Sequence, residues 1–256
     1  MFAAFDLTVT TATGLRDLLH AWSHAAALMT AGHPVGPPGG ALTTAPADTG
    51  EAVGLSAANL TVTFGLGPGI FVAEGHDRFG LATRRPRPLS PLEPFPGDRL
   101  VAARSGGDVC VQACADDPQV AFHAVRDLAR IGRGAATMRW AQFGFGKASA
   151  TSKTQATPRN LQGFKDGTNN LDVTDAAETG RFVWVGRDEP QAWMRGGTYV
   201  VTRRIRMLVE KWDDSSLDDQ QDTIGRVKLS GAPLGERAEH DPVDLTARGP
   251  DGKPEI

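Results

Sequence analysis

The strongest constraint on the fold of this chain is the order in which strand-type and helix-type hydrophobic patterns follow one another along its first 145 residues. Alternation of apolar and polar side chains predicts a half-buried strand, and a run that is apolar on both faces predicts a central strand covered by helices. On these patterns, or on their aromatic content, four segments are predicted as strands: 3–10, 59–66, 108–115 and 135–145.

Two helices are predicted between these strands. Apolar residues at helical spacing follow a cap at Thr11 or Thr13 and continue to near Gly32. A second apolar stripe covers 117–131, with Gly132 just beyond its end as a C-cap. The order strand, helix, strand, strand, helix, strand is that of a ferredoxin-like unit, so an α+β fold with an antiparallel sheet is predicted.

The segments without a regular pattern suggest where the chain divides. Residues 33–57 are rich in Gly, Pro, Ala and Thr and predict a long surface loop. The polar stretch 146–160 predicts a connection between two units, which we place at 1–147 and 148–256. In the second unit, the patterns predict strands over 181–186 and 197–207, a short helix over 208–212, and a helix from a Ser216 cap to Ile224 that Gly225 ends.

Charge and cysteine content exclude several classes of partner. The chain has 27 Lys and Arg against 30 Asp and Glu, with a net charge of −3 and no basic stripe, so neither nucleic acid nor a membrane is expected as a partner. The two cysteines, Cys110 and Cys114, would lie about 13 Å apart on one face of a strand, which is too far for a disulfide. We predict two core thiols.

The segment 163–169, Gly-Phe-Lys-Asp-Gly-Thr-Asn, has the composition of a tight glycine-flanked turn. Such a turn would present the carboxylate of Asp166 on a rigid loop, and its glycines would let the backbone approach a flat ligand. The amides of Gly167 and Thr168 could meet a ligand oxygen. By itself, a motif of this length is more often only a turn.

Several further motifs stand in the same order as in the dye-decolorising peroxidase family, and the chain strongly resembles its A-type, deferrochelatase-like branch. Besides 163–169, the segments that carry this resemblance are 183–185, 197–199, 203–206, 210–212, 222–226, 230–235 and, upstream, Phe64, 75–81 and 107–114. The resemblance implies tandem ferredoxin-like units with antiparallel sheets, of the dimeric α/β barrel type, with the second unit incomplete. It also implies haem b (iron protoporphyrin IX), held mainly by the C-terminal unit.

The resemblance also implies roles for individual residues. Asp166 matches the distal aspartate, which takes a proton from hydrogen peroxide and returns it to the leaving oxygen. Gly167, Thr168 and Asn169 would line the distal face of the haem. The implied partners are hydrogen peroxide, small aromatic reductants such as dyes or phenols, and further copies of the chain in a homo-oligomer. The implied location is extracellular or periplasmic by twin-arginine export, although no such signal stands at this N-terminus.

The chain departs from the family pattern at the iron ligand. In the family, a histidine on a segment resembling Asp-Ala-His-Ile-Arg binds the iron, and that segment follows the region that here is 251–256. His240 matches a non-ligand position, so no metal ligand is assigned in this chain. Either a C-terminal companion polypeptide supplies it, or the chain is a truncated product that cannot bind haem normally. Beside the peroxidase, the alternative functions are a haem-binding, iron-releasing protein and an inactive truncated fragment.

Other side chains have two interpretations each. Either Arg203 or Arg204 is predicted to face a haem propionate. The acidic residues between 210 and 222 are interpreted as a solvated helix face rather than a calcium or manganese site. The aromatic residues that either relay electrons from surface substrates or pack in the core are Trp184, Trp193, Tyr199 and Trp212.

Overall fold

The structure is a computed structural model that describes residues 1–90, 92–144, 156–243 and 246. The chain divides into two compact units, Met1–Phe145 and Gly146–Ile256, and each is described by itself. The predicted boundary between residues 147 and 148 lies outside the described residues and stays a prediction. Within the described ranges, none of the helices has both the length and the apolar character that crossing a membrane requires.

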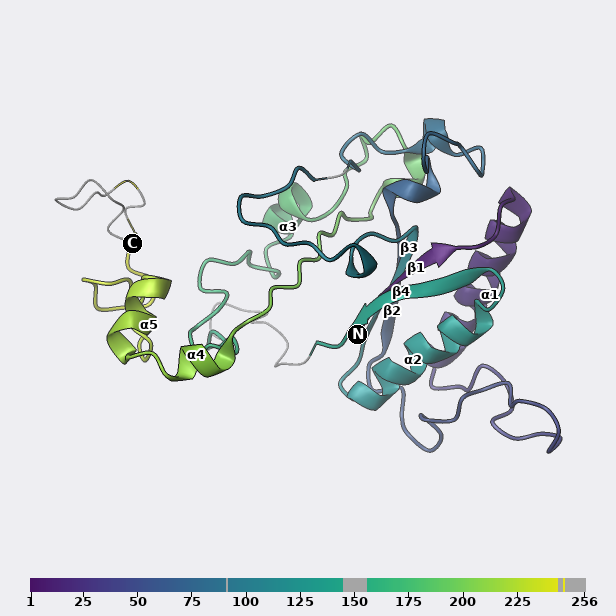
Figure 1. The fold of residues 1–256 in the computed structure, drawn as a ribbon, viewed down its shortest axis with the longest axis horizontal. Helices are drawn as coiled ribbons and strands as arrows, with labels where there is room; N and C mark the ends of the chain where they lie inside the picture. Colours follow the sequence, from purple (N-terminus) through teal and green to yellow (C-terminus); the bar gives the residue numbers. More distant parts are fainter. Residues whose placement is uncertain (91, 145–155, 244–245, 247–256) are drawn as a thin grey trace. The chain divides into compact units, whose positions relative to one another are not determined.

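The first unit is a four-stranded antiparallel sheet with two helices (Figure 1). The strands lie side by side in the order β2-β3-β1-β4, and their chain order with the helices is β1-α1-β2-β3-α2-β4. This is the predicted ferredoxin-like arrangement, and the α+β fold class is confirmed. The bounds are β1 Phe2–Leu7, α1 Ala12–Thr30, β2 Thr61–Leu66, β3 Val109–Cys114, α2 Pro118–Ile131 and β4 Ala136–Gln142.

Both helices begin and end where local chemistry predicts. The Thr11 side chain accepts a hydrogen bond from the backbone N–H of Gly14 at 3.1 Å, so Thr11 rather than Thr13 is the cap of α1. The Asp117 carboxylate accepts from the N–H of Gln119 at 2.7 Å and caps α2. Helix α2 ends at Ile131 with Gly132 as its C-cap residue, as predicted.

The core of the first unit is centred on Trp22 of α1, which is fully buried. Its ring meets Phe5 of β1 edge-on at 5.2 Å between centroids and stacks on Phe64 of β2 at 5.8 Å. Its indole N–H donates to the carbonyl oxygen of Leu128 in α2 at 2.8 Å. One side chain therefore joins both helices and the sheet, and its only polar group has a partner, as burial requires.

The prediction that β3 is covered on both faces is wrong. Val109, Val111 and Ala113 are buried, whereas the alternate residues Cys110 and Cys114 are half-buried and exposed, respectively. The reason is that both helices pack on the same face of the sheet. Cys114 is therefore not a core thiol, and both cysteines are free, as expected for their spacing.

The loop between α1 and β2 contains no helix or strand over 33–57, as predicted. It is not only a surface connection, however, because Asp48 within it is completely buried. The N–H of Thr49 donates to Asp127 of α2 at 3.1 Å, and the side-chain amide of Gln119 donates to the carbonyl oxygen of Glu51 at 2.7 Å. This part of the loop therefore runs along α2.

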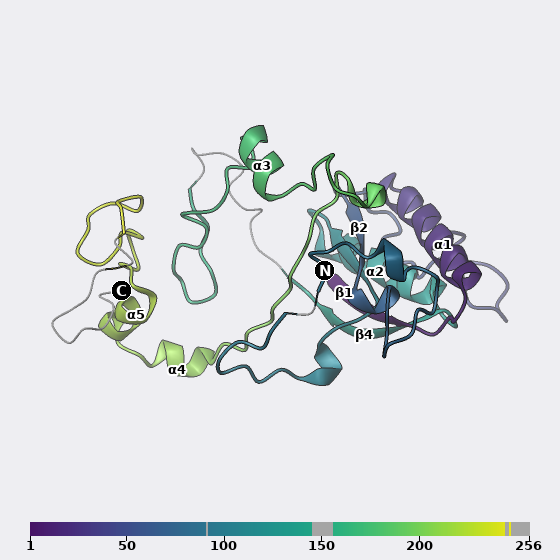
Figure 2. The ribbon, with the colours of Figure 1, turned by 90° about the horizontal axis from the view of Figure 1, so that it is seen from above.

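The described part of the second unit consists of short helices joined by long irregular segments (Figure 2). The predicted helices at 208–212 and after Ser216 are confirmed, and the Ser216 hydroxyl accepts from the N–H of Asp219 at 3.1 Å. Gly225 ends the last helix with a φ of 77°, a left-handed conformation that suits glycine. The helices are α3 Ala176–Phe182, α4 Val209–Asp213 and α5 Leu217–Ile224. Across both units, the 3₁₀ turns among the described residues are Pro68–Ile70, Ala82–Arg84, Ala102–Arg104 and Ala192–Met194.

The two strands predicted in the second unit are wrong for this structure. Residues 181–182 belong to α3, and 197–207 form no strand. A strand needs a neighbouring backbone that completes its hydrogen bonds, and no described segment pairs with 197–207 as a ladder. Its apolar side chains Val200, Val201 and Ile205 are correspondingly exposed.

Candidate functional site

The predicted turn at 163–169 is built on a buried phenylalanine. The side chain of Asn160 accepts hydrogen bonds from the backbone N–H groups of Gln162 and Phe164, at 3.0 and 3.2 Å. Phe164 is only 1% exposed and meets Trp212 edge-on, with ring centroids 5.9 Å apart. Gly163 has a φ of 84°, which disfavours any residue with a side chain. The turn therefore has one defined conformation and its apolar residue lies underneath.

Asp166 lies on the outer side of this turn and is exposed. Its backbone N–H donates to the carbonyl oxygen of Pro158 at 2.8 Å, while its carboxylate accepts no hydrogen bond from the described part of the chain. The neighbouring Gly167 is exposed as well, with a φ of 112°. A Cβ at Gly167 would meet nothing closer than Asn170, at 4.0 Å, so a flat ligand has room beside the backbone here.

Glu239 holds the turn in place from another part of the chain. Its carboxylate pairs with the ammonium of Lys165 and accepts from the hydroxyl of Thr157. The hydroxyl of Thr168 donates to the same carboxylate at 3.0 Å. Burial by itself would raise the pKa of Glu239, but the hydrogen bonds from Lys165, Thr157 and Thr168 outweigh it and lower the pKa to about 2. Glu239 is therefore ionised at neutral pH.

Thr168 and Asn169 line a cavity of about 420 Å³, together with residues 224–226 and 239–243. Asp166 and Gly167 are not among its lining residues. The structure therefore places two of the four predicted site residues in the wall of the cavity and the other two on the adjoining exposed part of the turn.

These residues fit one face of a flat haem group. The open backbone at Gly167, the exposed carboxylate of Asp166 and the adjacent cavity are the features that such a face requires. Arg226 lines the cavity, but its guanidinium donates to the carbonyl oxygens of Gly231 and Glu239, at 2.6 and 3.0 Å, and so supports the surrounding loop. The imidazole of His240 also lines the cavity. No residue of the described ranges is assigned as an iron ligand.

The other predicted groups are less well defined. Of the four aromatic residues for which core packing was one interpretation, Trp212 packs against a buried ring. It contacts Phe164 and donates its indole N–H to the carbonyl oxygen of Gln162 at 3.1 Å. Trp184, Trp193 and Tyr199 are exposed. Arg203 and Arg204 are both exposed and lie outside any strand, so the structure does not single out either of them as the residue that faces a propionate.

Sequence reasoning missed two groups of interacting polar residues. Lys165 and Glu239 are 74 residues apart, and no local pattern predicts their pairing. In the first unit, His123 and Asp127 come together with Asp48, and all three are buried. The spacing of His123 and Asp127, four residues apart on a predicted helix, was a signal that could have been used.

Comparison with known proteins agrees with this structure. The model of the family described as "Dyp-type peroxidase, N-terminal" matches residues 1–146, and that described as "Dyp-type peroxidase, C-terminal" matches residues 157–253. The chain belongs to the Dyp-type peroxidase family.

Among its curated relatives is the Deferrochelatase of Yersinia pseudotuberculosis serotype I (strain IP32953), which is 39% identical over 257 residues, covering 99% of this chain and 57% of the relative. The Deferrochelatase of Escherichia coli (strain K12) is 42% identical over 197 residues, covering 76% of this chain and 45% of the relative. The chain therefore spans about half the length of the curated relatives that it matches.

Two similar solved structures come from Streptomyces. The DyP-type peroxidase of Streptomyces coelicolor superposes with a TM-score of 0.81 at 39% identity, covering 99% of this chain and 65% of that one. Ferric DtpA from Streptomyces lividans gives a TM-score of 0.79 at 39% identity, with the same coverage of 99% and 65%.

Proposed function

We propose that this chain forms the distal part of a haem b peroxidase, in which Asp166 moves a proton between the two oxygens of hydrogen peroxide while one-electron donors are oxidised. The observation that carries this proposal is the exposed carboxylate of Asp166 on a defined turn, beside the open backbone of Gly167 and next to a cavity. Membership of the family supports haem as the cofactor.

The haem, when bound, supplies the redox chemistry, and the residues of the turn supply the proton transfer. A general acid–base group must lie within hydrogen-bond reach of the proton that it moves, in a fixed position. Phe164 and Glu239 fix the turn from two sides. Lys165 is the neighbour of Asp166 in the sequence. Its ammonium pairs with the carboxylate of Glu239 and not with that of Asp166. Asp166 is thus available to a ligand.

The physiological setting belongs to the same proposal. Dyes and phenols are proposed as reductants, and the extracellular or periplasmic space as the location, on the basis of the resemblance to the A-type branch. Two further proposals rest on the family resemblance alone: a C-terminal companion polypeptide that supplies the iron ligand, and a homo-oligomer of this chain. His240, although it lines the cavity, is not proposed as that ligand.

The test is haem binding and peroxide-dependent dye oxidation by the purified chain, together with any polypeptide that copurifies with it. Asp166→Asn removes the acid–base group without changing the size of the side chain, and we expect it to lower kcat/KM for hydrogen peroxide by about 10²- to 10⁴-fold. Asp213→Asn is the matched control, because Asp213 is an exposed carboxylate at the end of α4, and it should leave the rate unchanged. Equal rates for Asp166→Asn and the unsubstituted protein, or no haem binding, would overturn the proposal.

A second candidate function is the release of iron from haem. It is favoured by the name Deferrochelatase, which the curated relatives at 39% and 42% identity bear. In this reaction the iron leaves as an ion and two protons replace it, so that the intact porphyrin remains. Metal-free porphyrin fluorescence that appears without peroxide would support this function, whereas peroxide-dependent dye oxidation without porphyrin release would support the first.

A further inference from the structure

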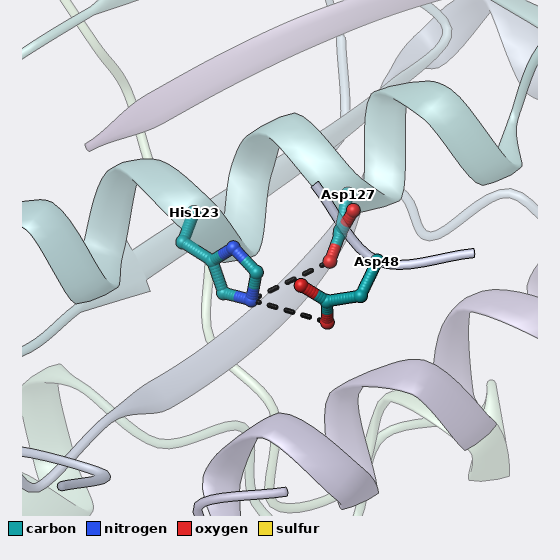
Figure 3. Close-up of side chains that lie close together, drawn as sticks. All are labelled: Asp48, His123 and Asp127. Atoms are coloured by element: carbon teal, nitrogen blue, oxygen red, sulfur yellow. Dashed lines mark ion pairs between the residues drawn. The ribbon is translucent and has the colours of Figure 1, made fainter. Parts of the chain in front are cut away.

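Three buried side chains of the first unit converge on one point beside α2. Asp48 comes from the loop between α1 and β2, and His123 and Asp127 come from successive turns of α2 (Figure 3). Their side chains are 1%, 5% and 0% exposed, respectively. One ligand atom from each lies within 4.8 Å of the others. A nitrogen and two carboxylate oxygens thus surround a small space from which solvent is excluded.

The distances in this cluster are too long for ordinary hydrogen bonds. His123 Nε2 lies 3.5 Å from Asp48 Oδ2 and 3.4 Å from Asp127 Oδ2. An N–H···O hydrogen bond is usually about 2.7–3.2 Å long, and a single Nε2–H cannot point at two carboxylates at once. By contrast, ligand atoms about 2.1 Å from a tetrahedral zinc ion are about 3.4 Å apart, which matches both distances.

One atom of the cluster has no hydrogen-bond partner among the described residues. Asp127 Oδ2 is buried and makes no hydrogen bond, although the other carboxylate oxygen of Asp127 accepts from the N–H of Thr49. Asp48 is oriented by the N–H groups of Val35 and Gly50, at 3.0 and 2.7 Å. Backbone groups therefore set the direction of both carboxylates, and an unpartnered oxygen is aimed at His123. A buried carboxylate oxygen without a donor is costly unless a cation completes it.

The second nitrogen of His123 has the partner that a metal-binding imidazole usually has. His123 Nδ1 lies 3.0 Å from a carboxylate oxygen of Glu51, and the other oxygen of Glu51 pairs with Arg126. Donation of Nδ1–H to Glu51 leaves the lone pair of Nε2 directed at Asp48 and Asp127. This arrangement of carboxylate, histidine and metal is typical of the surroundings of zinc sites.

We propose that Asp48, His123 and Asp127 bind one divalent transition-metal ion of the zinc class, with Glu51 as a positioning residue. The mixed nitrogen and oxygen donors favour such an ion over Ca²⁺ or Mg²⁺, which prefer oxygen ligands alone. Three protein ligands leave one position of a tetrahedral ion for water. Because all three ligands are buried, the ion would be structural and would fasten the 33–57 loop to α2. The site lies wholly in the first unit and does not depend on the proposed peroxidase activity.

The experiment is titration of the full chain, free of affinity tags and chelator-treated, with zinc sulfate alone. We expect one equivalent of zinc to bind and to raise the Tm of the protein, since a ligand that binds only the folded state stabilises it. Co²⁺ in place of zinc should give the visible absorption of a four-coordinate ion.

Asp127→Asn is the decisive variant because it should fold without metal. Its amide oxygen can still accept from Thr49, and its amide N–H can donate to His123 Nε2, so that the unpartnered atom gains a partner. We expect this variant to melt no lower than the metal-free parent, and to lose the zinc-dependent rise in Tm and the cobalt spectrum. Glu51→Gln should weaken zinc binding by about 10- to 100-fold and still allow saturation.

His24→Gln is the matched control, because His24 is an exposed histidine of α1, and it should bind zinc like the parent. Zinc binding of equal affinity by the parent and Asp127→Asn would overturn the proposal, since it would place the ion elsewhere. So would the absence of stoichiometric zinc binding, or tighter binding of Ca²⁺ than of zinc.

Discussion

Replacing Glu239 by glutamine should loosen the turn that presents Asp166. The carboxylate of Glu239 is 13% exposed, and its contacts with Lys165, Thr157 and Thr168 lower its pKa from the ordinary value of 4.5 to about 2. A pKa difference of this size corresponds to about 3 kcal/mol of stability at neutral pH, because a tenfold change in an equilibrium constant is worth about 1.4 kcal/mol. Glu239→Gln removes the charge and leaves the ammonium of Lys165, which is 20% exposed, without its counter-ion.

The assay is hydrogen–deuterium exchange of the backbone amides of residues 157–169 at neutral pH. We expect exchange in Glu239→Gln to be faster by up to about a hundredfold, which is the equivalent of about 3 kcal/mol. Glu236→Gln is the control, since Glu236 is an exposed carboxylate three residues away. Equal exchange in Glu239→Gln and in the parent would refute the view that this network fixes the turn.

The same pair of proteins gives a prediction of pH dependence. Because the pKa of Glu239 is lower in the folded protein, its contribution is complete above the unfolded-state value of 4.5 and is lost as the pH falls towards 2. The difference in free energy of unfolding between the parent and Glu239→Gln, measured by urea denaturation, should therefore shrink over this range. A difference that is the same at both ends of the range would contradict the assigned pKa.

Two further substitutions test the packing of each unit. Trp22→Phe should lower the free energy of unfolding of the first unit by about 1–3 kcal/mol in urea denaturation, because it removes the hydrogen bond to Leu128 and leaves a space in the core. An unchanged midpoint of the urea transition would contradict the central place given to Trp22. Gly231→Ala should lower the Tm, because Gly231 has a φ of 78° and a Cβ there would lie 2.6 Å from Cδ of Lys165. Gly235→Ala also has a positive φ but an open Cβ position, and it should have a smaller effect, so equal effects would show that contact with Lys165 is unimportant.

The sequence patterns predicted the first unit because the information there is local. Helix α1 begins at the Thr11 cap and α2 ends before Gly132, and both signals lie within a turn of the boundary that they set. In the same way, the Ser216 cap and Gly225 bound α5. The order of the elements then restricts the sheet to few arrangements, and the ferredoxin-like one is confirmed.

The features that were not predicted depend on residues far apart in the chain. Segment 197–207 has a strand-like composition, but composition does not say whether another segment pairs with it. Glu239 reaches Lys165 across 74 residues, and Asp48 reaches His123 across β2 and β3. In the candidate site, the glycines predicted the turn at 163–169. No sequence pattern predicted that the carboxylate of Glu239 holds this turn in place.

The face of the sheet that lies away from α1 and α2 carries both cysteines of the chain, and their thiols can report on the exposure of this face to solvent. Burial raises the pKa of the Cys110 thiol, whereas Cys114 on the same face is exposed. A thiol reacts as its thiolate, so a maleimide dye should modify Cys114 well before Cys110. The rate at which Cys114 is labelled then measures how much of the time this face is accessible to solvent, and any protein that docks on the sheet will be detectable by the protection that it gives to a single sulfur atom.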